Sequence, residues 1–241
     1  MIELNLSFGI KVITKIIRRN KLQCRWKSFN SAEWLKRRDN DIYFERAKKE
    51  NYRCRSAFKL IEIDDKYKLI QPGHNVIDIG AAPGSWSQVL AKRTNANGAD
   101  GKRPKGSVIA IDLSHIFPIE GVHVLSNMDF TSNAAQDKVM EVLGKKKLDF
   151  VFSDMAPKAS GVRDLDKTNI VNLVYPVIVF SVKNLRNGGG CLLKLWEGQH
   201  HKLVEDIKKF FKSITCVKPQ ATHSESSEIY VIGQQFYGLK K

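Results

Sequence analysis

The sequence lacks the features that mark several large classes of protein. No uninterrupted apolar stretch approaches the ~20 residues that a helix needs to span a bilayer, so we expect no membrane insertion. The four cysteines lie far apart, with no CxxC pair and no nearby histidine, which argues against a zinc site or a dense disulfide framework. We therefore expect no bound metal and a reducing compartment.

Negative charge is scarce. The 241 residues include 40 Lys and Arg against 25 Asp and Glu, and the formal net charge is +15. This excess indicates a polyanionic partner, and RNA, DNA and an anionic membrane surface all fit it. The length suits one α/β domain with a well-buried core plus a tail, and not two large domains.

Acidic residues are missing from the N-terminal segment. None lies between Glu3 and Glu33, whereas seven Lys and Arg residues do. Apolar residues at helical spacing run through the same stretch, at Leu6, Ile10, Ile13 and Ile17. The two patterns together predict a basic amphipathic helix. Residues 1–30 are therefore typical of a mitochondrial targeting presequence, with an RNA-binding or disordered basic tail as the alternative.

Short β-branched and apolar runs recur from residue 75 onwards and are typical of buried parallel strands. They predict strands over 75–80, 108–112, 122–125, 150–154 and 190–195. One helical pattern precedes the first strand and begins after Ser56, a plausible N-cap. Further helical patterns lie between the strands, over 87–92, 134–143 and 170–185. This alternation predicts a parallel sheet covered by helices on both faces. The last two strand-like segments, 213–217 and 228–233, leave no room for a helix and predict an antiparallel edge hairpin.

The first expected strand runs into a glycine-rich loop, Asp78-Ile79-Gly80-Ala81-Ala82-Pro83-Gly84-Ser85-Trp86. Gly80 and Gly84 would let the backbone pass close to a ligand, and the next helix presents unpaired N–H groups. Ligands of open α/β sheets bind beyond the carboxyl ends of the strands, where this loop lies. The loop is not GxGxxG, so a pyrophosphate is not its natural ligand.

Acidic residues also follow the next two strands. Asp112 ends the second strand, where a carboxylate can accept hydrogen bonds from ribose hydroxyls. Asp129, beside Phe130, follows the third strand, where a carboxylate could bind an adenine amino group. Asp112 alone could equally be a helix cap or a solvated loop residue. An acid after each of three successive strands suits a nucleoside that carries an ammonium group and no phosphate.

The Asp-x-Gly-x-x-Pro-Gly-x-Trp pattern resembles the FtsJ family of ribose 2′-O-methyltransferases, and the likeness runs from about Phe44 to Tyr237. It implies a single-domain Rossmann-like methyltransferase fold over residues 41–241, with a mostly parallel seven-stranded sheet. It also implies S-adenosyl-L-methionine as the cofactor. The implied cofactor contacts come from the loop and the strand ends: Gly80, Pro83, Gly84, Ser85, Trp86, Asp112, Asp129, Phe130 and Asp154.

Four charged residues match the Lys-Asp-Lys-Glu tetrad of the same family: Lys59, Asp154, Lys194 and Glu228. Methyl transfer to a ribose hydroxyl needs a base, and a lysine can serve if its surroundings favour the neutral amine. The resemblance assigns the base role to Lys194 and an orienting role to Asp154. It leaves Lys59 and Glu228 to shape the charge around the hydroxyl.

Each member of the tetrad also has an ordinary interpretation. Lys59 could be one more RNA-facing cation, and Asp154 a loop carboxylate. Lys194 could extend its ammonium from a strand end to water, and Glu228 could protect an edge strand from aggregation. Their order, beside a cofactor loop, favours catalysis. The loop 154–157 carries no aromatic residue, which argues against amino-group methylation of a flipped base.

A basic and aromatic run over residues 43–55, termed the basic segment, leads to Lys59. Its Tyr and Phe residues could stack on bases while its cations contact phosphates. The expected RNA-binding cations are Arg46, Lys48, Lys49, Arg53 and Arg55. A solvated basic face is the alternative.

Two further segments, 53–60 and 113–118, are similar to those of mitochondrial family members that modify large-subunit ribosomal RNA. The resemblance implies a monomer in the mitochondrial matrix that acts on the large ribosomal subunit precursor. The implied target is a uridine in the peptidyl-transferase A-loop of the large-subunit rRNA. Methylation of a tRNA or an mRNA cap is one alternative, and a ribosome-assembly factor with dispensable activity is another.

Overall fold

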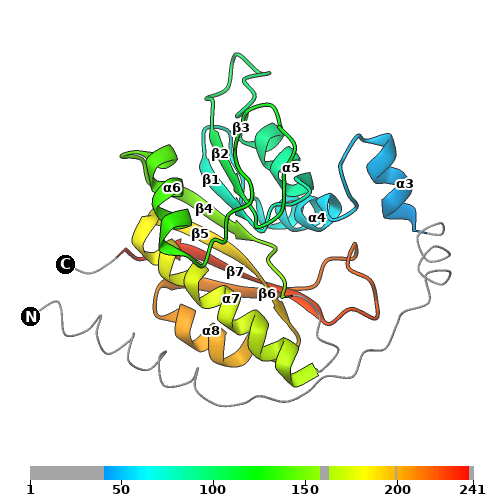
Figure 1. Ribbon diagram of the computed structural model, residues 1–241, viewed down its shortest axis with the longest axis vertical. Helices are drawn as coiled ribbons and strands as arrows, with labels where there is room; N and C mark the ends of the chain where they lie inside the picture. The colour runs from blue at the N-terminus through cyan, green and yellow to red at the C-terminus, as the bar shows by residue number, and fades with distance from the viewer. Residues whose placement is uncertain (1–40, 158–162, 199, 239–241) are drawn as a thin grey trace, which may run out of the picture.

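A computed structural model describes residues 41–157, 163–198 and 200–238. A seven-stranded sheet lies at its centre (Figure 1), in the order β3-β2-β1-β4-β5-β7-β6. The strands are β1 (Asn75–Ile79), β2 (Ser107–Ile111), β3 (Val122–Leu125), β4 (Leu148–Ser153), β5 (Leu185–Trp196), β6 (Phe211–Val217) and β7 (Glu228–Phe236). The expected presequence, residues 1–30, lies outside the described residues.

Five strands run parallel, and β7 runs antiparallel to both of its neighbours, β5 and β6. The expected Rossmann-like fold with a mostly parallel sheet is therefore confirmed. The expected antiparallel edge hairpin is confirmed as well: β6 and β7 pair with each other, with β6 at the edge of the sheet and β7 between β5 and β6. This arrangement places Glu228, the first residue of β7, opposite Trp196 of β5 and two register positions from the partner of Lys194.

Helices cover both faces of the sheet (Figure 1). They are α3 (Ile42–Lys49), α4 (Ala57–Tyr67), α5 (Ser85–Arg93), α6 (Asn133–Leu143), α7 (Arg163–Asn184) and α8 (His200–Lys208). On one face α4 and α5 pack over a buried cluster that includes Val76 and Leu192. On the other face α6, α7 and α8 pack over a cluster that includes Ile77 and Leu193. Because neighbouring strand residues point to opposite faces, the central strands β1, β2, β4 and β5 bury apolar side chains on both faces.

Two helix starts differ from the sequence expectation. Ser56 precedes α4, but its hydroxyl does not cap the helix and instead lies 2.9 Å from the Ser85 hydroxyl. Helix α7 begins at Arg163, before the expected residue 170, and continues through Pro176. Val174 and Val177 beside this proline are buried, so packing offsets the lost backbone hydrogen bond. Among the described residues no helix is both long and apolar enough for a membrane crossing.

Candidate active site

A pocket of about 280 Å³ opens at the carboxyl ends of the central strands. The chain passes from β1 outwards to β3 and then returns to the other side of β1 as β4. The strand order reverses there, which is where open α/β sheets bind their ligands. Gly80 after β1, Asp112 after β2 and Asp154 after β4 all line the pocket. Asp129 and Phe130 line it as well.

The pocket carboxylates are held by backbone N–H groups. Asp112 accepts hydrogen bonds from the N–H groups of Ala82 (2.9 Å) and Ser114 (2.7 Å). Asp129 accepts from the N–H of Thr131 at 2.9 Å and from its hydroxyl at 2.7 Å. Each of the two carboxylates keeps two lone pairs for a ligand after these contacts. Their orientation is therefore fixed before any ligand arrives.

The remaining cofactor-loop residues do not line this pocket. Trp86 is only 2 % exposed; its indole N–H donates to the carbonyl of Ser56 at 2.8 Å. The Ser85 side chain is buried too, beside the Ser56 hydroxyl. Gly84 has a φ of +112°, and a Cβ there would lie 2.7 Å from Arg53 Nη1. Pro83, Gly84, Ser85 and Trp86 thus shape the loop, and the Trp86 side chain itself is closed to a ligand.

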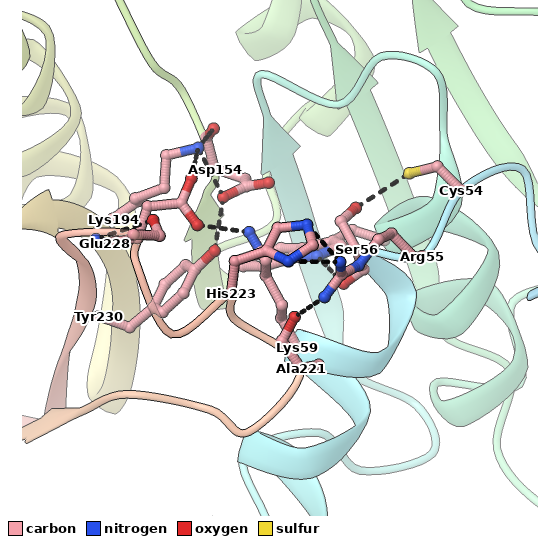
Figure 2. A network of polar contacts seen from close by, with 12 residues as sticks. Cys54, Arg55, Ser56, Lys59, Asp154, Lys194, Ala221, His223, Glu228 and Tyr230 are labelled. Carbon is pink, nitrogen blue, oxygen red and sulfur yellow. Dashed lines mark hydrogen bonds and ion pairs between the residues drawn. The ribbon is translucent and has the colours of Figure 1, made fainter. Parts of the chain in front are cut away.

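The four tetrad residues converge from four separate elements (Figure 2). Lys194 Nζ donates to the backbone carbonyl of Asp154 at 2.7 Å and lies 3.0 Å from its carboxylate. Lys59 Nζ lies 2.5 Å from the Glu228 carboxylate, which is also 3.7 Å from Lys194 Nζ. Glu228 is thus engaged mainly by Lys59, and Asp154 by Lys194. Lys194 is 5 % exposed, so its ammonium is paired inside the protein and does not extend to bulk water.

The FtsJ-like methyltransferase family model matches residues 52–236 of the chain. The chain belongs to this family. It is 45% identical over 213 residues to rRNA methyltransferase 2, mitochondrial, of Drosophila melanogaster, covering 88% of this chain and 85% of that protein. It is 37% identical to ribosomal RNA large subunit methyltransferase E of Methanosphaera stadtmanae, covering 87% and 100%. A Plasmodium falciparum ribosomal RNA methyltransferase structure superposes with a TM-score of 0.68 at 30% identity, covering 78% and 100%.

The chain is therefore a methyltransferase, and Tyr230 is a site residue of this FtsJ-like enzyme that the sequence reasoning missed. Its hydroxyl donates to the Asp154 carboxylate at 2.8 Å, and its ring packs on Trp86. Tyr230 pairs directly with Lys194 in the β5–β7 register and lies two residues after Glu228. The two-residue period of a strand puts Tyr230 on the same face as Glu228, which is the signal that could have found it.

The tetrad and Tyr230 perturb one another electrostatically. Burial raises the pKa of Tyr230, and the carboxylates of Asp154 and Glu228 raise it further, so its hydroxyl stays protonated as a donor. Burial would also raise the pKa of Glu228, but the ammonium groups of Lys59 and Lys194 outweigh it and hold that pKa below its ordinary value. The result is an ionised Glu228 between two lysines.

Asp78 in β1 is a buried carboxylate that interacts electrostatically with Asp112 and Asp154 of the pocket. It is fully buried and accepts a hydrogen bond from the Ser87 hydroxyl at 2.6 Å. Its other carboxylate oxygen has no partner among the described residues. Burial raises the pKa of Asp78 to about 7; the Ser87 hydrogen bond opposes this, and repulsion from Asp154 and Asp112 adds to it. No group of three or more His, Cys, Asp or Glu side chains within residues 41–157, 163–198 and 200–238 could hold a metal.

The cations of the basic segment divide into two sets. On α3, Arg46 and Lys48 are exposed and pair with neighbouring glutamates, and Lys49 is exposed as well. Arg53 and Arg55 instead turn inwards. Arg53 donates to three backbone carbonyls, and Arg55 forms an ion pair with Asp41 and contacts the Ala221 carbonyl and His223 (Figure 2). These two guanidinium groups are therefore committed to the fold, which the sequence pattern did not indicate.

Proposed function

We propose that this methyltransferase transfers a methyl group from S-adenosyl-L-methionine to the 2′-hydroxyl of a uridine in mitochondrial large-subunit rRNA. The observation that carries the proposal is the position of Asp154. It lines the pocket, and its carboxylate also lies 3.0 Å from Lys194 Nζ. A cofactor site and a buried lysine thus share one residue.

The donor set of the pocket fits S-adenosyl-L-methionine. Asp112 suits ribose hydroxyls and Asp129 suits an adenine amino group, while Leu113, Met128 and Phe130 supply an apolar wall. Three carboxylates favour a cationic ligand and disfavour phosphate. S-adenosyl-L-methionine supplies, when bound, a methyl group on a positively charged sulfur. Gly80, where a Cβ would lie 2.8 Å from the Met155 backbone nitrogen, lets the loop approach β4 at the pocket floor.

Lys194 is the proposed base, with the other tetrad members around it. With S-adenosyl-L-methionine supplying the methyl group, the neutral amine form of Lys194 would accept the proton that the 2′-hydroxyl loses. The carbonyl and carboxylate of Asp154 orient the amine, and Tyr230 orients that carboxylate. Lys59 neutralises Glu228 and so lowers the negative charge near the reacting oxygen.

The substrate and the location rest on relatives. The Drosophila relative is named as a mitochondrial rRNA methyltransferase, and the Methanosphaera stadtmanae relative as a ribosomal RNA large subunit methyltransferase. A presequence-like segment at residues 1–30 supports import into the mitochondrial matrix. We further propose that the protein acts as a monomer, that residues 41–241 form its methyltransferase domain, and that the substrate is a large-subunit precursor.

The test is methyl transfer by the purified protein. It is incubated with S-adenosyl-L-methionine and a large-subunit rRNA transcript that carries the A-loop, with a tRNA transcript in parallel, and the nucleosides are identified by mass spectrometry. We expect one 2′-O-methyluridine per rRNA transcript. Lys194→Ala should lower the rate at least about 100-fold, the usual contribution of a general base, and Lys102→Ala, an exposed control, should not. A methyl group on a base, preference for tRNA, or an active Lys194→Ala variant would contradict the proposal.

A further inference from the structure

Arg53 joins three stretches of backbone that are far apart in the sequence. Its Nη1 donates to the carbonyls of Pro83 and Phe117, each at 2.8 Å. Its Nη2 donates to the carbonyl of Pro118 at 2.7 Å. Pro83 belongs to the loop after β1, and residues 117–118 belong to the loop after β2. One guanidinium group therefore holds these two loops together.

The backbone around Arg53 is fixed to the same region. The Arg53 N–H donates to the side-chain carbonyl of Gln88 on α5 at 2.9 Å. The Gln88 amide in turn donates to the carbonyl of Asn51 at 2.9 Å. Gly84 leaves the space that the guanidinium fills, because a Cβ there would meet Arg53 Nη1 at 2.7 Å. Hydrogen bonds from the backbone and the side chain thus hold residues 51–53 against Pro83, at the end of the cofactor loop, and against Gln88 on α5.

Both loops that Arg53 holds also form the pocket. Ala82, next to Pro83, lines it, and Asp112 and Leu113 begin the loop that contains residues 117–118. On the pocket side the two loops are joined by the hydrogen bond from the Ala82 N–H to Asp112. Arg53 joins them a second time, at Pro83 and residues 117–118. The distance between the loops, and so the shape of the pocket, depends on both links.

Arg53 is also close in sequence to the exposed cations of α3. Helix α3 ends at Lys49, and the Tyr52 N–H donates to the carbonyl of Ala47 at 2.8 Å. The short connection to Arg53 is therefore itself held by hydrogen bonds. Hydrogen bonds thus connect the end of α3 to the residue whose guanidinium holds the cofactor loops.

We propose that Arg53 is a positioning residue that couples RNA binding on α3 to cofactor binding in the pocket. The inference rests on the proposed function, because it takes RNA as the ligand of Arg46, Lys48 and Lys49. RNA bound to these cations reduces the motion of the basic segment. Through its hydrogen bonds, Arg53 then reduces the motion of the loops after β1 and β2. Cofactor affinity then rises when RNA is bound, and RNA affinity rises by the same factor when the cofactor is bound.

The experiment measures S-adenosylhomocysteine affinity by calorimetry, with and without a saturating rRNA transcript that carries the A-loop. For the wild type we expect the transcript to tighten binding about fivefold, the low end of known couplings. Arg53→Ala should weaken binding without RNA about tenfold or more and abolish the effect of RNA. Arg53→Lys keeps the charge but cannot reach three carbonyls, so it should lose most of the coupling. Lys102→Ala should behave as wild type.

The outcomes separate this inference from the function on which it rests. If wild-type protein does not bind S-adenosylhomocysteine, the proposed function fails. If Arg53→Ala and Arg53→Lys weaken RNA binding but keep the wild-type cofactor affinity and coupling, Arg53 is an ordinary RNA contact and the inference is overturned. If Arg53→Ala does not fold, Arg53→Lys decides on the same criterion. The reciprocal titration, RNA affinity with and without S-adenosylhomocysteine, must give the same factor. A wild type in which neither ligand changes the affinity of the other overturns the inference.

Discussion

At the scale of single residues, the site depends on how one carboxylate is shared. Asp154 faces the pocket, pairs with Lys194 and accepts a hydrogen bond from Tyr230. A carboxylate has lone pairs for all three contacts, but only one orientation satisfies them together. Tyr230 is fully buried and fixed by its packing on Trp86, so it is the rigid member of this group.

Tyr230→Phe should lower both catalysis and stability. The ring packing remains, while the hydrogen bond to the Asp154 carboxylate is lost; bonds to charged groups contribute about 1.5–3 kcal/mol. We expect kcat to fall about tenfold or more, and the melting temperature to fall by several degrees, at about 2–4 °C per kcal/mol for a chain of this size. Steady-state kinetics checks this, with Tyr237→Phe, an exposed tyrosine, as the matched control. Wild-type kcat in Tyr230→Phe would show that Asp154 needs no such support.

Asp78→Asn should change how stability depends on pH. The pKa of Asp78 is raised from 3.8 to about 7, so the folded state holds a proton that the unfolded state has released between these values. The wild type therefore loses stability as pH rises from about 4 to about 7, by at most roughly 4 kcal/mol. The variant lacks this titration, so its stability relative to wild type should increase over the same range.

Denaturant unfolding of the cofactor-free protein at pH 5 and pH 8 measures this difference. Asp137→Asn, on the exposed face of α6, is the matched control and should show no such trend. An equal stability difference between Asp78→Asn and wild type at both pH values would mean that Asp78 is ionised throughout.

At the scale of elements, the sequence predicted the parallel strands better than the contacts between them. The strand at Val122–Leu125 has the expected bounds, because its turn residues and β-branched run are local signals. The insertion of β7 between β5 and β6 is not local, and neither are the partners of Arg53, which lie 30 to 65 residues away. The tetrad could be named because its four charged residues match the family pattern, whereas Tyr230 lies within β7 and looks like a core residue.

Helix α3 carries the exposed part of the basic segment, and its effect on RNA binding can be measured. Replacing Arg46, Lys48 and Lys49 by alanine should weaken rRNA binding and reduce its salt dependence. Each lost phosphate contact should lower the log–log slope by about 0.7 for single-stranded RNA. Binding is measured as a function of KCl concentration. The same triple replacement at residues 145–147, on the turn before β4, keeps the charge change equal and should leave the slope unchanged.

At the scale of the whole molecule, the fold brings two ligands to one edge of the sheet. The pocket and the Asp154–Lys194 pair lie at the carboxyl ends of the central strands. Helix α3 lies next to α4 (Figure 1), which carries Lys59. The net charge of +15 favours association with RNA before any specific contact forms.

Deleting residues 1–28 should abolish mitochondrial localisation without affecting catalysis. A basic amphipathic helix with almost no acidic residues is the feature that an import machinery would recognise. Imaging of tagged full-length and shortened proteins measures the first effect, and the methyl transfer assay measures the second. Residues 1–30 fused to a reporter should direct it to mitochondria. Unchanged mitochondrial localisation of the shortened protein would assign these residues to RNA binding instead.

The most direct measurement is a map of 2′-O-methylation across the large-subunit rRNA of mitochondria in cells with the wild-type protein, without it, or with Lys194→Ala. We predict that one uridine loses its methyl group both without the protein and in the variant. Large-subunit assembly recorded in the same cells separates a catalytic role from an assembly role. An rRNA map that stays unchanged in cells without the protein would contradict the proposed function.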